Sequence, residues 1–194
     1  MGAVTLDLDF SKVNPKQKLA LEDKHKYIGY GGARGGGKSW FVRVKAILLA
    51  VFYAGIKVLI VRQTYPELMN NHIREMRNIL YKIAKYVDKE KIFYFPNGST
   101  IQFMYCHNDA DLDRFQGTEF DVIFIDEATH LTEYQIKTIG LCMRGANEFP
   151  KRIYFTTNPG GASHHYFKRI FIDKDYMPDE NPEDYSFIQA LVTD

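Results

Sequence analysis

The chain has little cysteine and no long apolar run. Its 194 residues include only two cysteines, Cys106 and Cys142, which have no partner at metal-ligand spacing. This scarcity excludes a disulfide scaffold and a cysteine-rich zinc site, and it favours buried thiols in a reducing compartment. No stretch approaches the roughly 20 apolar residues of a membrane-spanning helix, and the N-terminus lacks a secretion signal pattern. We therefore expect a soluble, cytoplasmic protein without a membrane partner.

A strong net charge is also missing, since the formal charge is only +1. Residues 173–194 hold seven acids and one lysine, a net −6, which leaves +7 on residues 1–172. That body could contact nucleic acid locally, but charge alone favours the plainer interpretation of a solvated surface with an acidic tail. With 45% hydrophobic residues and 14% aromatics, the length suits one self-supporting domain.

The apolar runs predict alternating strands and helices, which is typical of a mainly parallel α/β sheet flanked by helices. The expected strands are 27–30, 57–61, 122–125 and 152–156, and the expected helices begin near residues 15, 38, 66, 132 and 164. Residues 92–95 and 100–105 flank Pro-Asn-Gly-Ser, so we expect an added antiparallel β-hairpin. A last strand-like run, 187–192, has no evident partner.

A glycine-rich phosphate-binding loop is the most specific motif. Its residues are Gly32, Ala33, Arg34, Gly35, Gly36, Gly37, Lys38 and Ser39, which match G-x-x-x-x-G-K-[ST] between an expected strand and an expected helix. Glycines let backbone N–H groups converge on phosphates, Lys38 reaches the β- and γ-phosphates, and Ser39 ligates Mg²⁺. We include Trp40, the next residue, in the nucleotide site. The loop predicts a P-loop NTPase fold that binds ATP with Mg²⁺.

Two acids, Asp126 and Glu127, close the apolar strand 122–125. In a chain with a phosphate loop, Asp126 is expected to hold Mg²⁺ and Glu127 to act as the base toward the attacking water. A helix N-terminus with acidic capping is the simpler alternative. A carboxylate base favours hydrolysis over binding alone, so we expect an ATPase.

Other candidates carry weaker signals. Arg34, inside the loop, and Arg114 are possible arginine fingers, although a surface salt bridge explains each equally well. Gln17 precedes the loop, where its amide could read the adenine edge, but alone it favours a plain helix residue. Thr156, Thr157 and Asn158 end a strand expected beside that of Asp126, so they could sense the γ-phosphate or simply cap a turn.

Together these motifs resemble the large terminase subunit of tailed bacteriophages. The likeness rests on Gln17, on the loop from Gly31, on Val-Ile-Phe-Ile-Asp-Glu-Ala from Val122 and on Thr-Thr-Asn-Pro from Thr156. Further agreement lies in Ile-Val-Arg-Gln-Thr-Tyr-Pro from Ile60, in residues 114–119 and in residues 165–169. The likeness spans nearly the whole chain, and the order of the motifs also agrees.

The resemblance implies an ATPase motor that moves double-stranded DNA into a capsid in the cytoplasm of an infected bacterial host. Its expected partners are a portal protein, a small terminase subunit and further copies in a ring, although the isolated chain could be monomeric. Arg34 and Arg114 are then the finger candidates, and Thr156 to Asn158 are the coupling motif. We expect residues 1–172 to be the ATPase domain and residues 173–194 an acidic linker toward an absent nuclease domain, so this chain should not cut DNA.

Two other functions fit part of the pattern. A helicase-like ATPase acting on nucleic acid would share the loop, the acidic pair and the upstream glutamine. A nucleotide-gated assembly module would bind ATP with little turnover. A GTPase is disfavoured, because the sequence lacks the Asn-Lys-x-Asp motif that reads guanine.

Overall fold

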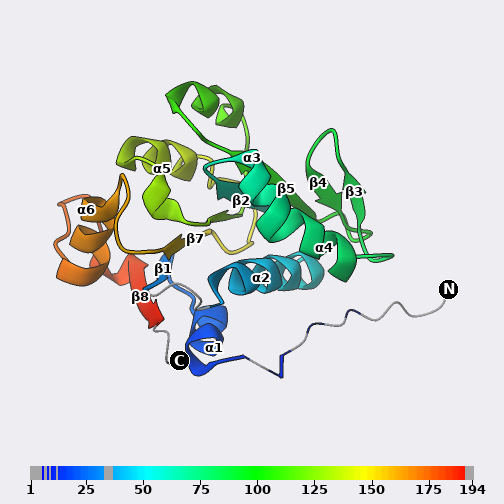
Figure 1. The fold of residues 1–194 in the computed structure, drawn as a ribbon, viewed down its shortest axis with the longest axis horizontal. Helices are drawn as coiled ribbons and strands as arrows, with labels where there is room; N and C mark the ends of the chain where they lie inside the picture. The colour runs from blue at the N-terminus through cyan, green and yellow to red at the C-terminus, as the bar shows by residue number, and fades with distance from the viewer. Residues whose placement is uncertain (1–5, 7, 9, 12, 33–36, 191–194) are drawn as a thin grey trace.

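A single mixed sheet with helices on both faces forms the centre of the molecule (Figure 1). The computed structural model describes residues 6, 8, 10, 11, 13–32 and 37–190. The strands in chain order are β1 (Tyr27–Gly32), β2 (Lys57–Arg62), β3 (Lys85–Val87), β4 (Ile92–Tyr94), β5 (Thr100–Tyr105), β6 (Val122–Ile125), β7 (Arg152–Thr157) and β8 (Tyr185–Ala190). Their order across the sheet is β3-β4-β5-β2-β6-β7-β1-β8. Strand β4 pairs antiparallel with β3 and β5, and the other described pairings are parallel, so the expected mainly parallel sheet with an added hairpin is confirmed.

The core has two halves, one on each face of the sheet, because successive residues of a strand point to opposite faces. On β2, Val58 packs in one half and Leu59 in the other. Helix α2 (Lys38–Phe52) covers the first half, and α5 (Glu133–Gly140) and α6 (His164–Phe167) cover the second. The central strands are therefore buried on both faces, which explains their unbroken apolar sequences.

The helix expected to begin at Pro66 changes its winding along its length. Helix α3 (Tyr65–Leu68) passes into a π-helical turn, η1 (Met69–Ile73), and then into α4 (Arg74–Ile79). Pro66 occupies the first turn, where its missing N–H costs nothing. A π-turn closes its hydrogen bonds over five residues instead of four, which rotates the side chains that follow. This turn buries His72 completely.

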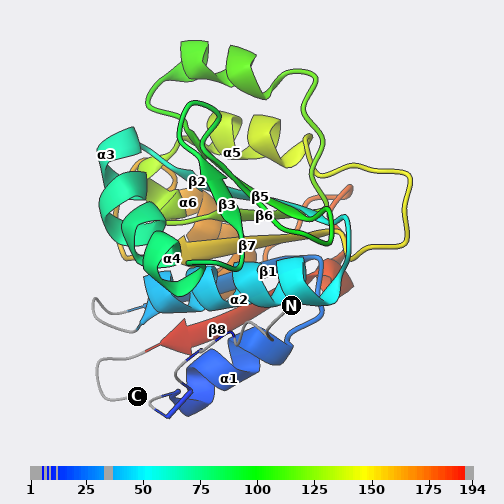
Figure 2. The same ribbon diagram turned by 90° about the vertical axis from the view of Figure 1, so that its right-hand side faces the viewer.

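The C-terminal segment belongs to the same sheet. Strand β8 pairs in parallel with β1, so the run that had no evident partner in the sequence lies beside the strand that leads into the glycine-rich loop. Helix α1 (Pro15–Glu22) contacts β8 at this edge (Figure 2). The expected linker, 173–194, thus contributes a strand to the fold.

Further helical turns complete the architecture. The turns are η2 (Asp109–Phe115), η3 (Ala128–His130), η4 (Lys168–Asp173) and η5 (Pro182–Asp184). Both cysteines, Cys106 and Cys142, are buried, and neither forms a disulfide. Burial raises the pKa of the Cys106 thiol to about 12. Within the described ranges, no helix is long and apolar enough to cross a membrane.

Candidate nucleotide site

Four parallel strands end at one edge of the sheet, where ligands of α/β proteins bind. Gly32 ends β1, Arg62 ends β2, Thr157 ends β7, and Asp126 directly follows β6. Strand β7 lies between β1 and β6. Thr156, near the end of β7, is therefore placed between the glycine-rich loop and the acidic pair.

The described part of the phosphate loop leads into α2. Ala33, Arg34, Gly35 and Gly36 lie outside the described residues. Gly37 has φ 65°, a left-handed conformation that glycine adopts most readily. Lys38 is buried, and burial lowers the pKa of its amine, whereas the charges of Asp126 and Glu127 act to raise it. The positive end of the α2 dipole and the Lys38 amine thus face the same region as the acids.

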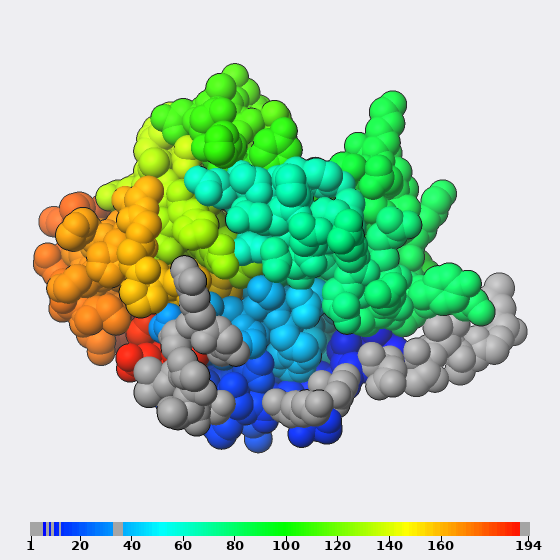
Figure 3. Space-filling view, in the orientation of Figure 1, coloured from blue at the N-terminus to red at the C-terminus, as the bar shows by residue number. Residues whose placement is uncertain are grey.

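A cleft of about 750 Å³ opens beside the start of α2. Its lining comes from three segments: Gly37, Lys38, Ser39, Trp40 and Arg43; Glu127, Thr129 and His130; and Asn158, Pro159, Gly160 and Gly161. Figure 3 shows the face on which α2 (light blue), α3 (cyan) and the segment after β7 (orange) are visible. A more open cavity of about 880 Å³ lies near the opposite ends of these strands, but none of the predicted site residues lines it. The smaller cleft therefore joins all three sequence motifs.

Asp126 is held from both sides of β6. Its backbone N–H donates to the Val61 carbonyl of β2 at 2.9 Å. Thr156 of β7 donates its hydroxyl to Asp126 Oδ1 at 2.5 Å. Asp126 Oδ2 lies 2.8 Å from His72 Nε2 and 3.3 Å from Arg62 Nε. Because β6 pairs in parallel with β2 and β7, the register itself places Arg62 and Thr156 beside this aspartate.

These contacts keep the Asp126 carboxyl ionised. Burial alone would raise its pKa, but the hydrogen bond and charge of His72, together with Arg62 and Thr156, hold the pKa well below its usual range. An ionised carboxylate and a serine hydroxyl are oxygen donors of the kind that Mg²⁺ prefers. Asp126 and Ser39, at this end of the sheet, therefore fit the predicted magnesium site.

Glu127 has a backbone conformation that is uncommon for a non-glycine residue, with φ 53°. Its N–H donates to the Thr156 hydroxyl at 2.8 Å. Its carboxylate Oε2 lies 2.6 Å from Arg62 Nη2 and 3.4 Å from His130 Nδ1. The Thr156 hydroxyl thus accepts from Glu127 and donates to Asp126, and one predicted coupling residue links both acids.

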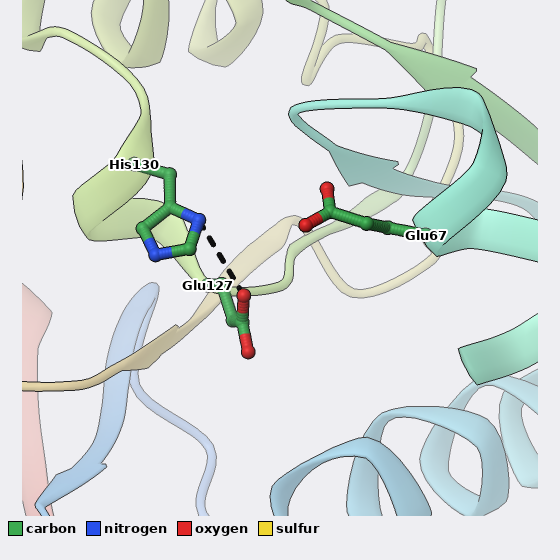
Figure 4. Close-up of side chains that lie close together, drawn as sticks. All are labelled: Glu67, Glu127 and His130. Atoms are coloured by element: carbon green, nitrogen blue, oxygen red, sulfur yellow. Dashed lines mark ion pairs between the residues drawn. The ribbon is translucent and has the colours of Figure 1, made fainter. Parts of the chain in front are cut away.

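Three side chains that lie close together could hold a metal ion, and two of them, Glu127 and His130, line the cleft. The ligand atoms of Glu67, Glu127 and His130 lie within 4.8 Å of one another (Figure 4). Glu67 also accepts a hydrogen bond from the Thr64 hydroxyl at 2.9 Å. A cation bound here would compete with Arg62 for Glu127, so this cluster would block the base rather than assist it.

Two further predicted residues lie beside the site. The Gln17 amide nitrogen is 3.4 Å from the Gly37 carbonyl, and its amide oxygen accepts the N–H of Asn14 at 3.0 Å. In this arrangement both ends of the amide contact the protein. Asn158 lines the cleft, and its buried Oδ1 has no hydrogen-bond partner among the described residues.

Arg114 lies apart from these residues. Its side chain is about half exposed, forms an ion pair with Asp111 at 2.9 Å and lies over the Tyr105 ring at 4.3 Å. It does not line the cleft. Its contacts are those of a surface residue that a second molecule could reach.

Sequence reasoning missed Arg62, His72 and Arg43. Arg62 is a charged residue at the end of an apolar strand, and Asp126 directly follows another apolar strand. This similar position at the carboxyl end of a strand could have indicated that Arg62 belongs to the site. His72 stands four residues after buried Leu68, so it falls on the apolar stripe of the expected helix. A polar residue at a position of that stripe was the available signal. Arg43 follows Ser39 by one helical turn, so it lies on the same face of α2.

The family of the chain follows from a comparison with known protein families. The family described as phage terminase large subunit matches residues 24–193, which is most of the chain. This chain belongs to that family. The resemblance seen in the motifs is thereby confirmed, and the fold is that of a terminase ATPase domain.

Solved terminase structures share this fold at low sequence identity. A large terminase from a thermophilic bacteriophage has a TM-score of 0.74 and 17% identity, over 93% of this terminase chain and 46% of that chain. The ATPase domain of the Thermus phage P74-26 large terminase has a TM-score of 0.64 and 14% identity, over 92% and 81%. The HK97 bacteriophage large terminase has a TM-score of 0.58 and 17% identity, over 78% of this terminase chain and 34% of that chain. This terminase chain thus spans about half the length of the first of these proteins, and a search of curated proteins gives no significant match.

Proposed function

We propose that this chain is the ATP-hydrolysing motor domain of a DNA-packaging terminase. The observation that carries the proposal is the meeting of Lys38 and Glu127 in one cleft, with Thr156 bonded to both Asp126 and Glu127 behind it. Structures of the thermophilic bacteriophage large terminase in complex with ADP and with ATP-gamma-S share this fold, which supports a nucleotide as the ligand.

Each residue has a distinct task in this proposal. Lys38 and the N-terminus of α2 bind the β- and γ-phosphates, and Arg34 or Arg114 supplies an arginine finger. Glu127 accepts the proton of the attacking water. Asp126 and Ser39 hold Mg²⁺, which when bound neutralises charge on the phosphates. Thr156, with Thr157 and Asn158, transmits the state of the γ-phosphate to the acids.

The motor acts on double-stranded DNA, which it moves into a capsid. Its partners are a portal protein, a small terminase subunit and further copies of the chain in a ring, in the cytoplasm of an infected bacterial host. The acidic segment 173–194 leads toward a nuclease domain. These assignments follow the family to which the chain belongs.

Steady-state ATP hydrolysis tests the proposal. Glu127→Gln removes the base but keeps the size of the side chain, so turnover should fall by about 10²- to 10⁴-fold while ATP still binds. The matched control is His25→Leu, which breaks the contact of a half-exposed histidine with Asp23 outside the cleft and should leave turnover unchanged. Equal turnover in wild type and Glu127→Gln would refute the assignment of the base.

The same samples separate the rival functions. Strand unwinding by the wild-type chain would favour a helicase-like ATPase. ATP that stays bound without turnover, with Glu127 intact, would favour an assembly module. DNA cleavage by a pure sample would contradict the placement of nuclease activity outside this chain.

A further inference from the structure

A histidine outside the sequence motifs reaches the centre of the site. His72 in η1 is fully buried, and its Nε2 lies 2.8 Å from Asp126 Oδ2. An ionised carboxylate can only accept hydrogen bonds, so Nε2 carries a proton and donates it. The other ring nitrogen, Nδ1, is buried and has no hydrogen-bond partner among the described residues. The contact with Asp126 therefore determines how the ring is oriented.

The π-helical turn is fixed to the helix that carries the phosphate-binding lysine. Arg43 of α2 donates from Nη1 to the carbonyl of Asn71 in η1 at 2.5 Å. Leu68 before the turn and Ile73 at its end are both fully buried in the core. Packing and this hydrogen bond thus hold the segment around His72 against α2.

Both oxygens of the Asp126 carboxylate are held by side-chain donors from different elements. His72 donates to Oδ2 from the π-turn, and Thr156 donates to Oδ1 from β7. Arg62 Nε lies near Oδ2 as well, at 3.3 Å. Two donors on opposite oxygens fix the plane of the carboxylate.

We propose that His72 is a positioning residue that holds Asp126 in the orientation needed to bind magnesium with the nucleotide. His72 acts through Asp126 and touches neither the metal nor the nucleotide. The inference rests on the proposed function in one respect, the assignment of Asp126 to Mg²⁺. Residues that hydrogen-bond to metal ligands commonly set metal affinity, and their loss typically weakens it by roughly 10- to 100-fold.

A purely structural role for His72 predicts a different result. A residue that only fills the core would, when replaced, destabilise the chain and weaken nucleotide binding with and without Mg²⁺ alike. A positioning residue affects the magnesium-dependent part alone. The comparison of nucleotide affinity with Mg²⁺ and with EDTA therefore separates the two roles.

The experiment is calorimetric titration of the whole chain with ATP-gamma-S, in Mg²⁺ and in EDTA. His72→Leu removes the donor, and His72→Asn keeps a polar group that is too short to reach Asp126. His72→Gln places an amide donor at the reach of Nε2. The control, His25→Leu, removes a histidine that pairs with an aspartate, Asp23, outside the cleft.

We expect His72→Leu and His72→Asn to lose roughly 10- to 100-fold of affinity in Mg²⁺ and little in EDTA. His72→Gln and His25→Leu should bind like wild type. If His72→Leu does not fold, the contrast between Asn and Gln decides. If Mg²⁺ still increases the ATP-gamma-S affinity of the Leu or Asn variant as it does for wild type, the role of His72 alone is overturned. If Mg²⁺ does not increase the ATP-gamma-S affinity of wild type, the assignment of Asp126 is overturned, and the role of His72 with it.

Discussion

Arg62 Nη2 lies 2.6 Å from Glu127 Oε2, at the end of the strand next to β6. Its Nε lies 3.3 Å from Asp126 Oδ2, and only 4% of the Arg62 side chain is exposed. One buried guanidinium therefore balances two adjacent carboxylates, one of them fully enclosed. Removing such a cation leaves uncompensated negative charge in a medium that solvates it poorly.

We predict that Arg62→Met destabilises the chain by about 3 to 5 kcal/mol, the usual cost of removing one partner of a buried ion pair. Urea denaturation measures the change. Neutralising an acid as well, in Arg62→Met with Asp126→Asn, should recover part of the loss. An Arg62→Met chain as stable as wild type would show that the guanidinium does not compensate these charges.

Thr156 offers a second test, because its single hydroxyl serves both acids. Thr156→Val keeps the shape but leaves the Glu127 N–H and Asp126 Oδ1 without this partner. We expect a loss of about 1 to 3 kcal/mol of stability, together with slower ATP turnover. Thr156→Ser keeps the hydroxyl and should retain most of both. Equal behaviour of Val and Ser would mean that the hydroxyl bridge has no role.

Lys45 should contribute stability that increases as the pH rises above neutrality. This amine of α2 donates to the Leu21 carbonyl at 2.5 Å, and burial lowers its pKa to about 8 from an ordinary value of 10.5. Between these two values the unfolded chain retains a proton that the folded chain has released. The contribution of Lys45 to the free energy of unfolding therefore increases with pH in this window, by at most about 1.4 kcal/mol per pH unit. The Cys106 thiol, whose pKa burial raises from 9.0, acts in the opposite direction above about pH 9.

Lys45→Met lacks the titrating amine, so its unfolding free energy should rise less steeply. Chemical denaturation of both chains between about pH 7 and about pH 10 measures the difference in slope. Parallel curves would mean that the Lys45 amine titrates alike in the folded and unfolded chains.

The start of α1 gives a prediction that separates capping from nucleotide binding. Asn14 and Gln17 form a reciprocal capping box, and Gln17 alone also approaches the Gly37 carbonyl. Asn14→Ala and Gln17→Ala should each cost about 1 kcal/mol of stability. Only Gln17→Ala should weaken ATP binding, as measured by calorimetry. Equal effects of both variants on ATP affinity would assign Gln17 to the helix cap alone.

The sequence predicted the positions of the strands and helices better than it predicted which strands pair with one another. Strands such as β6 were recognisable because a strand buried on both faces is apolar throughout. The place of β7 beside β6 was expected and is confirmed, but the pairing of β7 with β1 and the partner of β8 depend on contacts between distant segments, which leave no local pattern. The change of winding at η1 was hidden for the same reason, since tertiary packing decides it.

The site was predictable where a backbone motif defines it and hidden where side chains arrive from elsewhere. Lys38 and Glu127 line one cleft, and the charges of Asp126 and Glu127 both act on Lys38, in keeping with the loop and the acidic strand. Arg62 and His72 join them only through strand register and helix winding. The assignment of Arg34 stays a prediction, because it lies outside the described residues.

The π-helical turn also affects how related chains should be compared. An α-helix advances about 100° for each residue, so one additional residue in a turn rotates everything after it by that angle. Suppose that this helix is aligned without a gap to a relative that lacks the π-turn. His72 and the residues of α4 would then be matched to residues on a different face of the relative's helix. A gap placed within Met69–Ile73 would restore the correspondence, and the counterpart of His72 should be sought by its place beside the acidic strand.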